Sequence, residues 1–215
     1  MSENTQQIAV LTGDIVGSTQ QSSEDLSEIF QDLHECARVI ETLCGGPIHL
    51  TRHRGDGWQI ALPQKRFAIR SALLIRAKLK SREIGLDSYI GIAFGETDTE
   101  LKSDLNLETS DTFQRSGWAL EDVKSTKWAT RMITQDSPSH DAILSLLDHM
   151  IRNWTRTQSA EIYEKFTLIP TKSDTDIAKA LGKSRQAVSK SLKSTGADRI
   201  ELALGALEFN ESKRR

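Results

Sequence analysis

Residues 174–193 read Asp-Thr-Asp-Ile-Ala-Lys-Ala-Leu-Gly-Lys-Ser-Arg-Gln-Ala-Val-Ser-Lys-Ser-Leu-Lys. The first half places its apolar and small residues on one helical face: Ile177, Ala178 and Leu181. Gly182 follows, where a left-handed residue can end this helix. Ser184 is a suitable N-cap for a second helix, whose apolar residues Val188 and Leu192 have i, i+4 spacing. The stretch therefore predicts two short helices that cross through a tight glycine turn.

This stretch resembles the helix-turn-helix of bacterial transcription regulators in its Ile-Ala, Leu-Gly and Val positions. Its charge agrees, because residues 171–193 carry six Lys and Arg against two Asp. Arg and Gln side chains can read base edges, whereas Ser and Lys contact phosphates. The residues expected to contact double-stranded DNA are Lys183, Ser184, Arg185, Gln186, Ser189, Lys190 and Lys193. The alternative is two small surface helices whose charges are only solvated.

The composition is that of a protein with a core, since 37% of the 215 residues are hydrophobic and 27% are charged. No apolar run approaches the roughly 20 residues that cross a bilayer, and the N-terminus lacks a signal pattern. We therefore expect a cytoplasmic protein with no membrane partner. Cys36 and Cys44 fall within one predicted helix and have no partners at metal-ligand spacing, which predicts reduced thiols and no zinc site.

The charge is distributed unevenly along the chain. Residues 1–136 carry 15 Lys and Arg and 20 Asp and Glu, a net charge of −5, whereas residues 137–215 carry 13 and 10, a net charge of +3. Such an asymmetry favours a small-molecule domain joined to a nucleic-acid domain. We expect the first domain over 1–136 and the DNA-binding domain over 137–215, with the boundary at Gln135-Asp-Ser-Pro-Ser.

The hydrophobic pattern of the first 136 residues predicts an α+β fold. Strands are expected at 7–12, 47–54, 58–62, 87–94 and 127–133, and helices at 23–43, 63–82 and 112–124. The first six of these elements have the βαββαβ order of the ferredoxin-like arrangement, an antiparallel sheet with helices on one face, and a further helix and strand follow. The basic residues of 65–82 are interpreted as a solvated face, and 96–110 as a mobile loop. The second domain is expected to be all-α, with helices at 139–153, 155–168, 173–181, 184–194 and 197–209.

Two carboxylates are expected to meet at one end of this sheet. Asp14 ends the first strand, and Asp56 lies at the tip of the hairpin between the second and third strands. Because the first and third strands are neighbours in a ferredoxin-like sheet, both carboxylates can converge. Close carboxylates repel unless a cation lies between them, and Mg²⁺ with a nucleoside triphosphate is a common solution. Small residues follow at the predicted helix start, where backbone N–H groups can bind phosphates: Gly17, Ser18 and Thr19.

The alternative for this pair needs no ligand. Asp14 can cap a helix start, and Asp56 can serve the Asp-Gly turn of the hairpin. The residues alone leave both interpretations open.

These segments also resemble class III nucleotide cyclases over about residues 5–133. Residues 13–19, Gly-Asp-Ile-Val-Gly-Ser-Thr, are similar to their Asp-Ile-Val-Gly-Phe-Thr stretch. Residues 54–57 resemble their Gly-Asp hairpin, and residues 89–95 their following strand. The resemblance implies a homodimer, and Mg²⁺ or Mn²⁺ with a nucleoside triphosphate held by Asp14, Asp56 and the carbonyl of Ile15. Arg52 falls where such cyclases often carry a base-recognising lysine.

One part of the cyclase pattern is missing. Those enzymes carry an Asn and an Arg, four residues apart, that hold the ribose and the transition-state phosphate. Here residues 116–124 read Ser-Gly-Trp-Ala-Leu-Glu-Asp-Val-Lys, and Lys124 is the nearby cation expected to bind nucleotide. Losing preorganised charge of this kind costs orders of magnitude in rate, so we expect turnover to be slow or absent.

The whole chain resembles the bacterial SatD-type proteins. The residues that carry this likeness are Arg-Gly-Asp-x-x-Gln at 54–59 and Gln-Ser-Ala-Glu-Ile-Tyr at 158–163. Such proteins pair a cyclase-like domain with a DNA-binding one. We therefore expect a dimeric DNA-binding transcription regulator whose first domain senses a nucleotide or mediates dimerisation. The alternatives are a nucleotidyl cyclase with a regulatory helix-turn-helix domain, and a plain dimerisation domain without a ligand.

Overall fold

The computed structural model describes residues 6–53, 55–97, 100–125, 130–134 and 136–209. Within them the sheet consists of β1 (Gln6–Ile15), β2 (His49–His53), β3 (Gly57–Leu62), β4 (Ser88–Thr97) and β5 (Met132–Ile133). The α-helices are α1 (Ser23–Cys44), α2 (Ala68–Ser81), α3 (Asp111–Lys124), α4 (Pro138–Asn153), α5 (Arg156–Phe166), α6 (Asp174–Leu181), α7 (Arg185–Thr195) and α8 (Ala197–Phe209). Short 3₁₀ turns are η1 (Ser18–Gln20), η2 (Lys65–Phe67) and η3 (Leu105–Leu107).

The sheet has the order β2-β3-β1-β4-β5. The pairs β2–β3, β3–β1 and β1–β4 are antiparallel, as the βαββαβ prediction requires, and β1 lies between β3 and β4. The edge differs from the predicted all-antiparallel sheet, because β5 pairs with β4 in parallel. The reason is the crossover through α3, which returns the chain so that the next strand runs in the same direction as β4.

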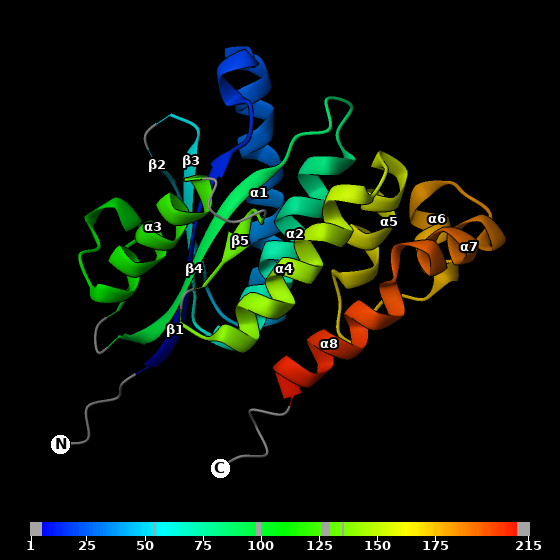
Figure 1. The fold of residues 1–215 in the computed structure, drawn as a ribbon. Helices are drawn as coiled ribbons and strands as arrows, with labels where there is room; N and C mark the ends of the chain where they lie inside the picture. Colours follow the sequence, from blue (N-terminus) through cyan, green and yellow to red (C-terminus); the bar gives the residue numbers. More distant parts are fainter. Residues whose placement is uncertain (1–5, 54, 98–99, 126–129, 135, 210–215) are drawn as a thin grey trace.

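Helices cover both faces of the sheet, so the prediction of helices on one face is wrong. Helices α1 and α2 pack on one face, and α3 packs on the other (Figure 1). Two glycines of β4 make room for α3. A Cβ at Gly91 would lie 2.3 Å from the backbone of Ser116 and Leu120, and one at Gly95 would lie 1.9 Å from Thr112. The helix backbone therefore approaches the strand more closely than any side chain would allow.

The α4–α8 segment packs against the side formed by α1 and α2 (Figure 1), and α5 lies along α2. One apolar cluster runs from the sheet through α2 into these helices, and includes Ile60, Leu73, Phe166 and Val188. The division of the chain at residue 136 stays a prediction. The expectation of a solvated basic face on α2 is wrong in part, because Arg70 and Arg76 are buried there.

Three local features complete the fold. The interval 96–110 was expected to be a mobile loop, but its described residues include η3, whose Leu105 is 1% exposed and donates its N–H to Thr51. Cys36 and Cys44 are buried free thiols, as predicted. Among the described residues no helix is long and apolar enough to cross a membrane.

Candidate functional site

The structure places the two predicted carboxylates at adjacent strand ends on one edge of the sheet. Asp14 is the penultimate residue of β1 and pairs with Gly57 of β3, so Asp56 is the residue immediately before its partner. The side chain of Asp14 is 19% exposed. It lies on the face covered by α3, because Thr12, two residues earlier in the strand, contacts Ser116 of α3 through their hydroxyls at 2.7 Å. The predicted convergence of strand ends is thus observed.

Lys124, the last residue of α3, supplies a positive charge to this pair. Its Nζ lies 2.7 Å from Oδ2 of Asp14, and its side chain is 37% exposed. The hydrogen bond to Asp14 raises the pKa of Lys124 above its ordinary value, and the charge of Asp56 acts in the same direction. One ammonium therefore faces two carboxylates, and the cluster of these three side chains retains a net negative charge.

Ser18 completes the cluster by donating its hydroxyl to Oδ2 of Asp56. Gly17, Ser18 and Thr19 do not open the following helix, which corrects the sequence prediction. Gly17 is left-handed at φ 75°, and the next residues form the short turn η1, whereas α1 begins only at Ser23 with a capping box. A single 3₁₀ turn offers no helix-type array of free N–H groups, so the phosphate-binding role of these backbone groups stays a prediction.

Buried polar groups that the sequence analysis did not identify hold the end of β1 in place. The Ser88 hydroxyl lies 2.9 Å from the carbonyl of Asp14 and receives the indole N–H of Trp58 at 3.1 Å. The N–H of Val16 donates to the carbonyl of Asp87 at 2.9 Å. Ile15, the proposed carbonyl ligand, has a buried side chain. The backbone at Asp14 and Val16 is therefore held by hydrogen bonds to residues 87 and 88.

Asp87 also connects this region to the helices. Its carboxylate takes two hydrogen bonds from Arg76, at 2.7 and 2.8 Å, and one from Arg131 at 2.6 Å. Burial alone would raise the pKa of Asp87, but the hydrogen bonds and charge of Arg76 outweigh it and lower that pKa. The same guanidinium donates to Asp148 of α4 at 2.7 Å. A fully buried arginine therefore joins the sheet to α4.

Arg52, expected near the nucleotide base, is not brought to the carboxylates. It lies opposite Trp58 in the β2–β3 pair, and its guanidinium is 4.4 Å from the ring centre of Phe30 on α1. Its Nε donates to the carbonyl of Gly55. Because Phe30 belongs to the α1 face, Arg52 lies on the side of the sheet opposite Lys124.

The stretch 174–193 forms the predicted pair of helices. Ser173 caps α6, Gly182 ends it with a left-handed φ of 63°, and Ser184 caps α7 by accepting from the N–H of Ala187 at 3.2 Å. Val188 is fully buried. Helix α5 packs against both α6 and α7. The capping residues thus set the ends of α6 and α7, and the apolar residues set the face that is buried.

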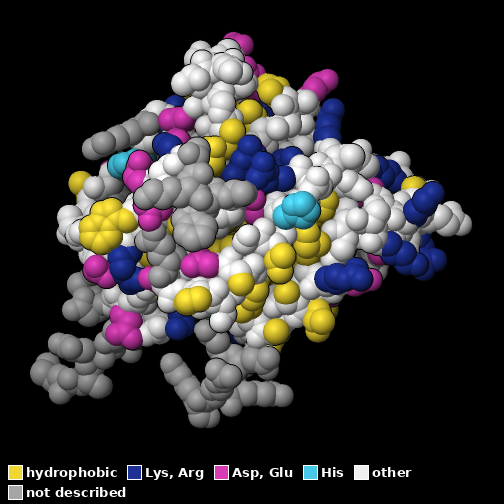
Figure 2. Space-filling view, in the orientation of Figure 1, with side chains coloured by type: hydrophobic (Ala, Val, Ile, Leu, Met, Phe, Trp, Pro, Cys, Tyr) yellow, Lys and Arg dark blue, Asp and Glu magenta, His cyan; other side chains and the backbone are white. Residues whose placement is uncertain are grey.

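The outward face of α7 is polar and open. Arg185, Gln186, Lys190 and Lys193 are exposed. None of these four side chains makes a hydrogen bond or ion pair with any residue that the structure describes. Lys and Arg side chains gather at this end of the molecule, over α6 and α7 (Figure 2). The face is therefore free to bind an external polar partner.

Three of the predicted contact residues already have structural partners or partial cover, and one of them is Ser184, whose hydroxyl caps α7. Lys183, in the turn, places its Nζ 2.8 Å from Oε1 of Glu161 on α5, a carboxylate that is 1% exposed. Ser189 is partly buried. Lys183 thus fixes the turn onto α5, which the spacing of residues along the chain did not reveal.

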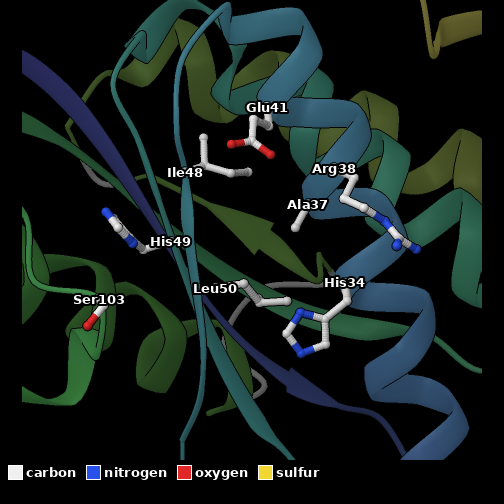
Figure 3. A pocket seen from close by; sticks show the side chains of 8 residues that line it. All are labelled: His34, Ala37, Arg38, Glu41, Ile48, His49, Leu50 and Ser103. Atoms are coloured by element: carbon white, nitrogen blue, oxygen red, sulfur yellow. The ribbon is translucent and has the colours of Figure 1, made fainter.

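A separate hollow lies between α1 and the edge strand β2, with a volume of about 460 Å³. Figure 3 shows His34, Arg38 and Glu41 along α1, with His49 and Ser103 on the other side of the strand. It contains none of the predicted site residues. In the described parts of the chain, no three His, Cys, Asp or Glu side chains are grouped so as to hold a metal ion. The hollow therefore has no metal-ligand set of this kind.

No protein-family model and no curated protein matches the chain. Solved structures are similar to part of it. A bacterial light-regulated adenylyl cyclase is 15% identical, with 60% of this chain and 75% of that chain covered and a TM-score of 0.42. The GGEEF domain of a diguanylate cyclase from Vibrio cholerae is 18% identical, with 57% and 79% covered and a TM-score of 0.41. The guanylate cyclase domain of RhGC from Catenaria anguillulae, in complex with GTP, is 20% identical, with 52% and 70% covered and a TM-score of 0.40. Similarities of this size do not identify a function.

Proposed function

We propose that the chain is a DNA-binding transcription regulator that contacts duplex DNA through α7, with a first domain that senses a nucleotide or mediates dimerisation. The observation that carries this is the outward face of α7. Arg185, Gln186 and Lys190 are exposed without partners among the described residues, on a helix whose opposite face is buried. Unpaired basic and amide side chains at the start of a helix suit the major groove.

Binding to pooled genomic fragments at low salt tests this proposal. Arg185→Ala should lower affinity by about 1–3 kcal/mol and relax base choice if it reads a base edge. Lys190→Ala should weaken all sequences alike and reduce the salt slope by about 1 if it contacts a phosphate. Lys102→Ala removes an exposed charge outside residues 174–193, together with a hydrogen bond to the Leu107 carbonyl, and serves as the control. Equal DNA binding by the wild type and the Arg185, Lys190 double variant would refute the proposal.

The proposal includes a homodimer formed through residues 5–133. A single α7 contacts few base pairs, whereas two copies related by a twofold axis contact both halves of a pseudo-palindrome. Light scattering of the full chain at micromolar concentration should give twice the mass of 24.0 kDa. A monomer at that concentration would remove this part of the proposal.

A second candidate is a metal-dependent nucleotidyl cyclase, favoured by the convergence of Asp14, Asp56 and Lys124. The donor set fits a divalent cation, because carboxylate and carbonyl oxygens are the ligands that Mg²⁺ and Mn²⁺ prefer. The ammonium of Lys124 already occupies a position beside Asp14 where a positive charge is stabilised. Asp14, Asp56 and the carbonyl of Ile15 would hold the ion, which would neutralise phosphate charge.

We propose that this site binds a metal–triphosphate complex but converts it to product slowly or not at all. Its residues provide charge for a metal–triphosphate complex, but 116–124 lack the Asn and Arg that stabilise a cyclisation transition state. A deficit of about 4 kcal/mol corresponds to roughly a thousandfold in rate. Calorimetry with ATP and GTP, each with Mg²⁺ and Mn²⁺, should give binding that Asp14→Ala and Asp56→Ala abolish. Rapid formation of a cyclic nucleotide would contradict the proposal that the site binds nucleotide without rapid turnover.

A further inference from the structure

The carboxylate pair already contains its own counter-ion. Lys124 reaches Asp14 from the end of α3 at 2.7 Å, whereas the side-chain partner of Asp56 among the described residues is the neutral hydroxyl of Ser18. The side chains of Lys124 and Asp14 are 37% and 19% exposed. A partly exposed ion pair contributes little to stability, so opening it costs little. The ammonium can therefore leave Asp14 without unfolding the strand or the helix.

The backbone beneath Asp14 does not depend on that ion pair. Ser88 of β4 donates its hydroxyl to the carbonyl of Asp14, and the carbonyl of Asp87, the residue just before β4, accepts the N–H of Val16. The hydroxyls of Thr12 and Ser116 are hydrogen-bonded and join β1 to α3 without the help of Lys124. Loss of the ion pair should therefore change the charge of the site and leave its shape intact.

We infer that Lys124 is a displaceable counter-ion: its ammonium and a divalent cation exclude each other at Asp14, and the released ammonium binds the triphosphate that arrives with the cation. This inference rests on the carboxylate site proposed above. Two cations beside one carboxylate repel each other, so a divalent ion alone must first displace Lys124. A triphosphate gives the displaced ammonium a new partner. Cation and triphosphate should therefore each strengthen binding of the other.

Two substitutions should have opposite and unusual effects. Lys124→Met removes the competitor, so it should raise the affinity for Mn²⁺ alone, by about tenfold if the coupling is of ordinary size. Asp14→Asn frees the ammonium, so it should abolish Mn²⁺ binding but raise the affinity for triphosphate in the absence of metal. The double variant should bind neither ligand. A residue with only a structural role would produce neither gain.

The full chain can be tested with Mn²⁺ alone, whose free concentration is measured by electron paramagnetic resonance. ATP, GTP and inorganic triphosphate, each with EDTA, are then titrated by calorimetry. Equal gains for all three in Asp14→Asn indicate recognition of the triphosphate alone, and a gain confined to one nucleotide indicates that the base is also bound. Lys102→Met removes one exposed charge elsewhere and should change neither affinity.

The outcomes separate the inference from the proposed site. Tighter Mn²⁺ binding by Lys124→Met, lost in Asp14→Asn, supports the exchange. If Mn²⁺ binding needs Asp14 but is unchanged or weaker in Lys124→Met, the carboxylate site stands and the displacement of Lys124 by the cation is refuted. No Mn²⁺ binding by either the wild type or Lys124→Met overturns both. Circular dichroism on each variant confirms that the fold is retained.

Discussion

Arg70→Met should destabilise the protein strongly, because it leaves a buried carboxylate without its partner. Arg70 on α2 and Glu208 on α8 have side chains that are 3% and 0% exposed, and they share two hydrogen bonds of 2.7 and 2.8 Å. The same guanidinium donates to the carbonyl of Phe166 at 3.2 Å. Methionine fills similar space but supplies none of these donors, and Glu208 has no access to water in the folded chain.

The expected loss is a large part of the total stability. Removing one partner of a buried ion pair costs about 3–5 kcal/mol, against about 5–15 kcal/mol for a typical domain. In a chain of this size each kcal/mol moves Tm by about 2–4 °C, so Tm should fall by roughly 6–20 °C. Replacing both residues, Arg70→Met with Glu208→Leu, should restore most of the stability, because an apolar pair of similar volume needs no hydrogen bonds.

Urea unfolding followed by circular dichroism and tryptophan fluorescence measures these differences. Arg199→Met provides a matched control, since Arg199 is an exposed arginine on the same helix as Glu208. The reasoning is refuted if Arg70→Met costs less than about 1 kcal/mol, the value of an exposed pair. It is also refuted if the double variant is no more stable than Arg70→Met. Either result would mean that this pair does not hold α8 on α2.

Three further expectations concern the core. Gly91→Ala should destabilise by about 1–3 kcal/mol through a clash with the α3 backbone, whereas Gly117→Ala, with nothing within 4 Å of the new Cβ, should not; thermal unfolding distinguishes them. The pKa of Asp87 is lowered in the fold, so its carboxylate stabilises the folded chain above its ordinary pKa of 3.8, and this stabilisation is lost as the pH falls through the lowered pKa. Asp87→Asn should therefore make the free energy of unfolding depend less steeply on pH in acid. Burial raises the pKa of Cys36 to about 12 and of Cys44 to about 11, so iodoacetamide at pH 8 should label them slowly in the native chain and rapidly in urea.

Local signals in the sequence determined where most helices begin and end. Ser184 was predicted as the N-cap of α7 and Gly182 as the end of α6, and both are confirmed. Strand alternation and the Gly-Asp-Gly turn placed β1, β2 and β3 within a few residues of their observed bounds. These features depend on contacts between residues at most four apart, so the order of residues is sufficient to predict them.

The sequence also located Asp14 and Asp56 at neighbouring strand ends, because the predicted βαββαβ order makes β1 and β3 adjacent. It did not identify the ion pair of Lys124 with Asp14, although both residues were candidates. Nor did it separate Arg52 from them, since the face on which a side chain lies depends on the register with the partner strand.

Only the tertiary structure decided which charges are buried and which remain free. Arg70 and Arg76 have the same helical pattern as a solvated basic face, but α5, α4 and α8 cover them, and their carboxylate partners Glu208 and Asp148 come from distant segments. Lys183 and Lys190 likewise appear equivalent along the chain. Lys183 is paired with Glu161 because α5 packs beneath the turn, whereas Lys190 is exposed. Partners more than twenty residues apart are set by packing of whole helices, and no local pattern in the sequence encodes that packing.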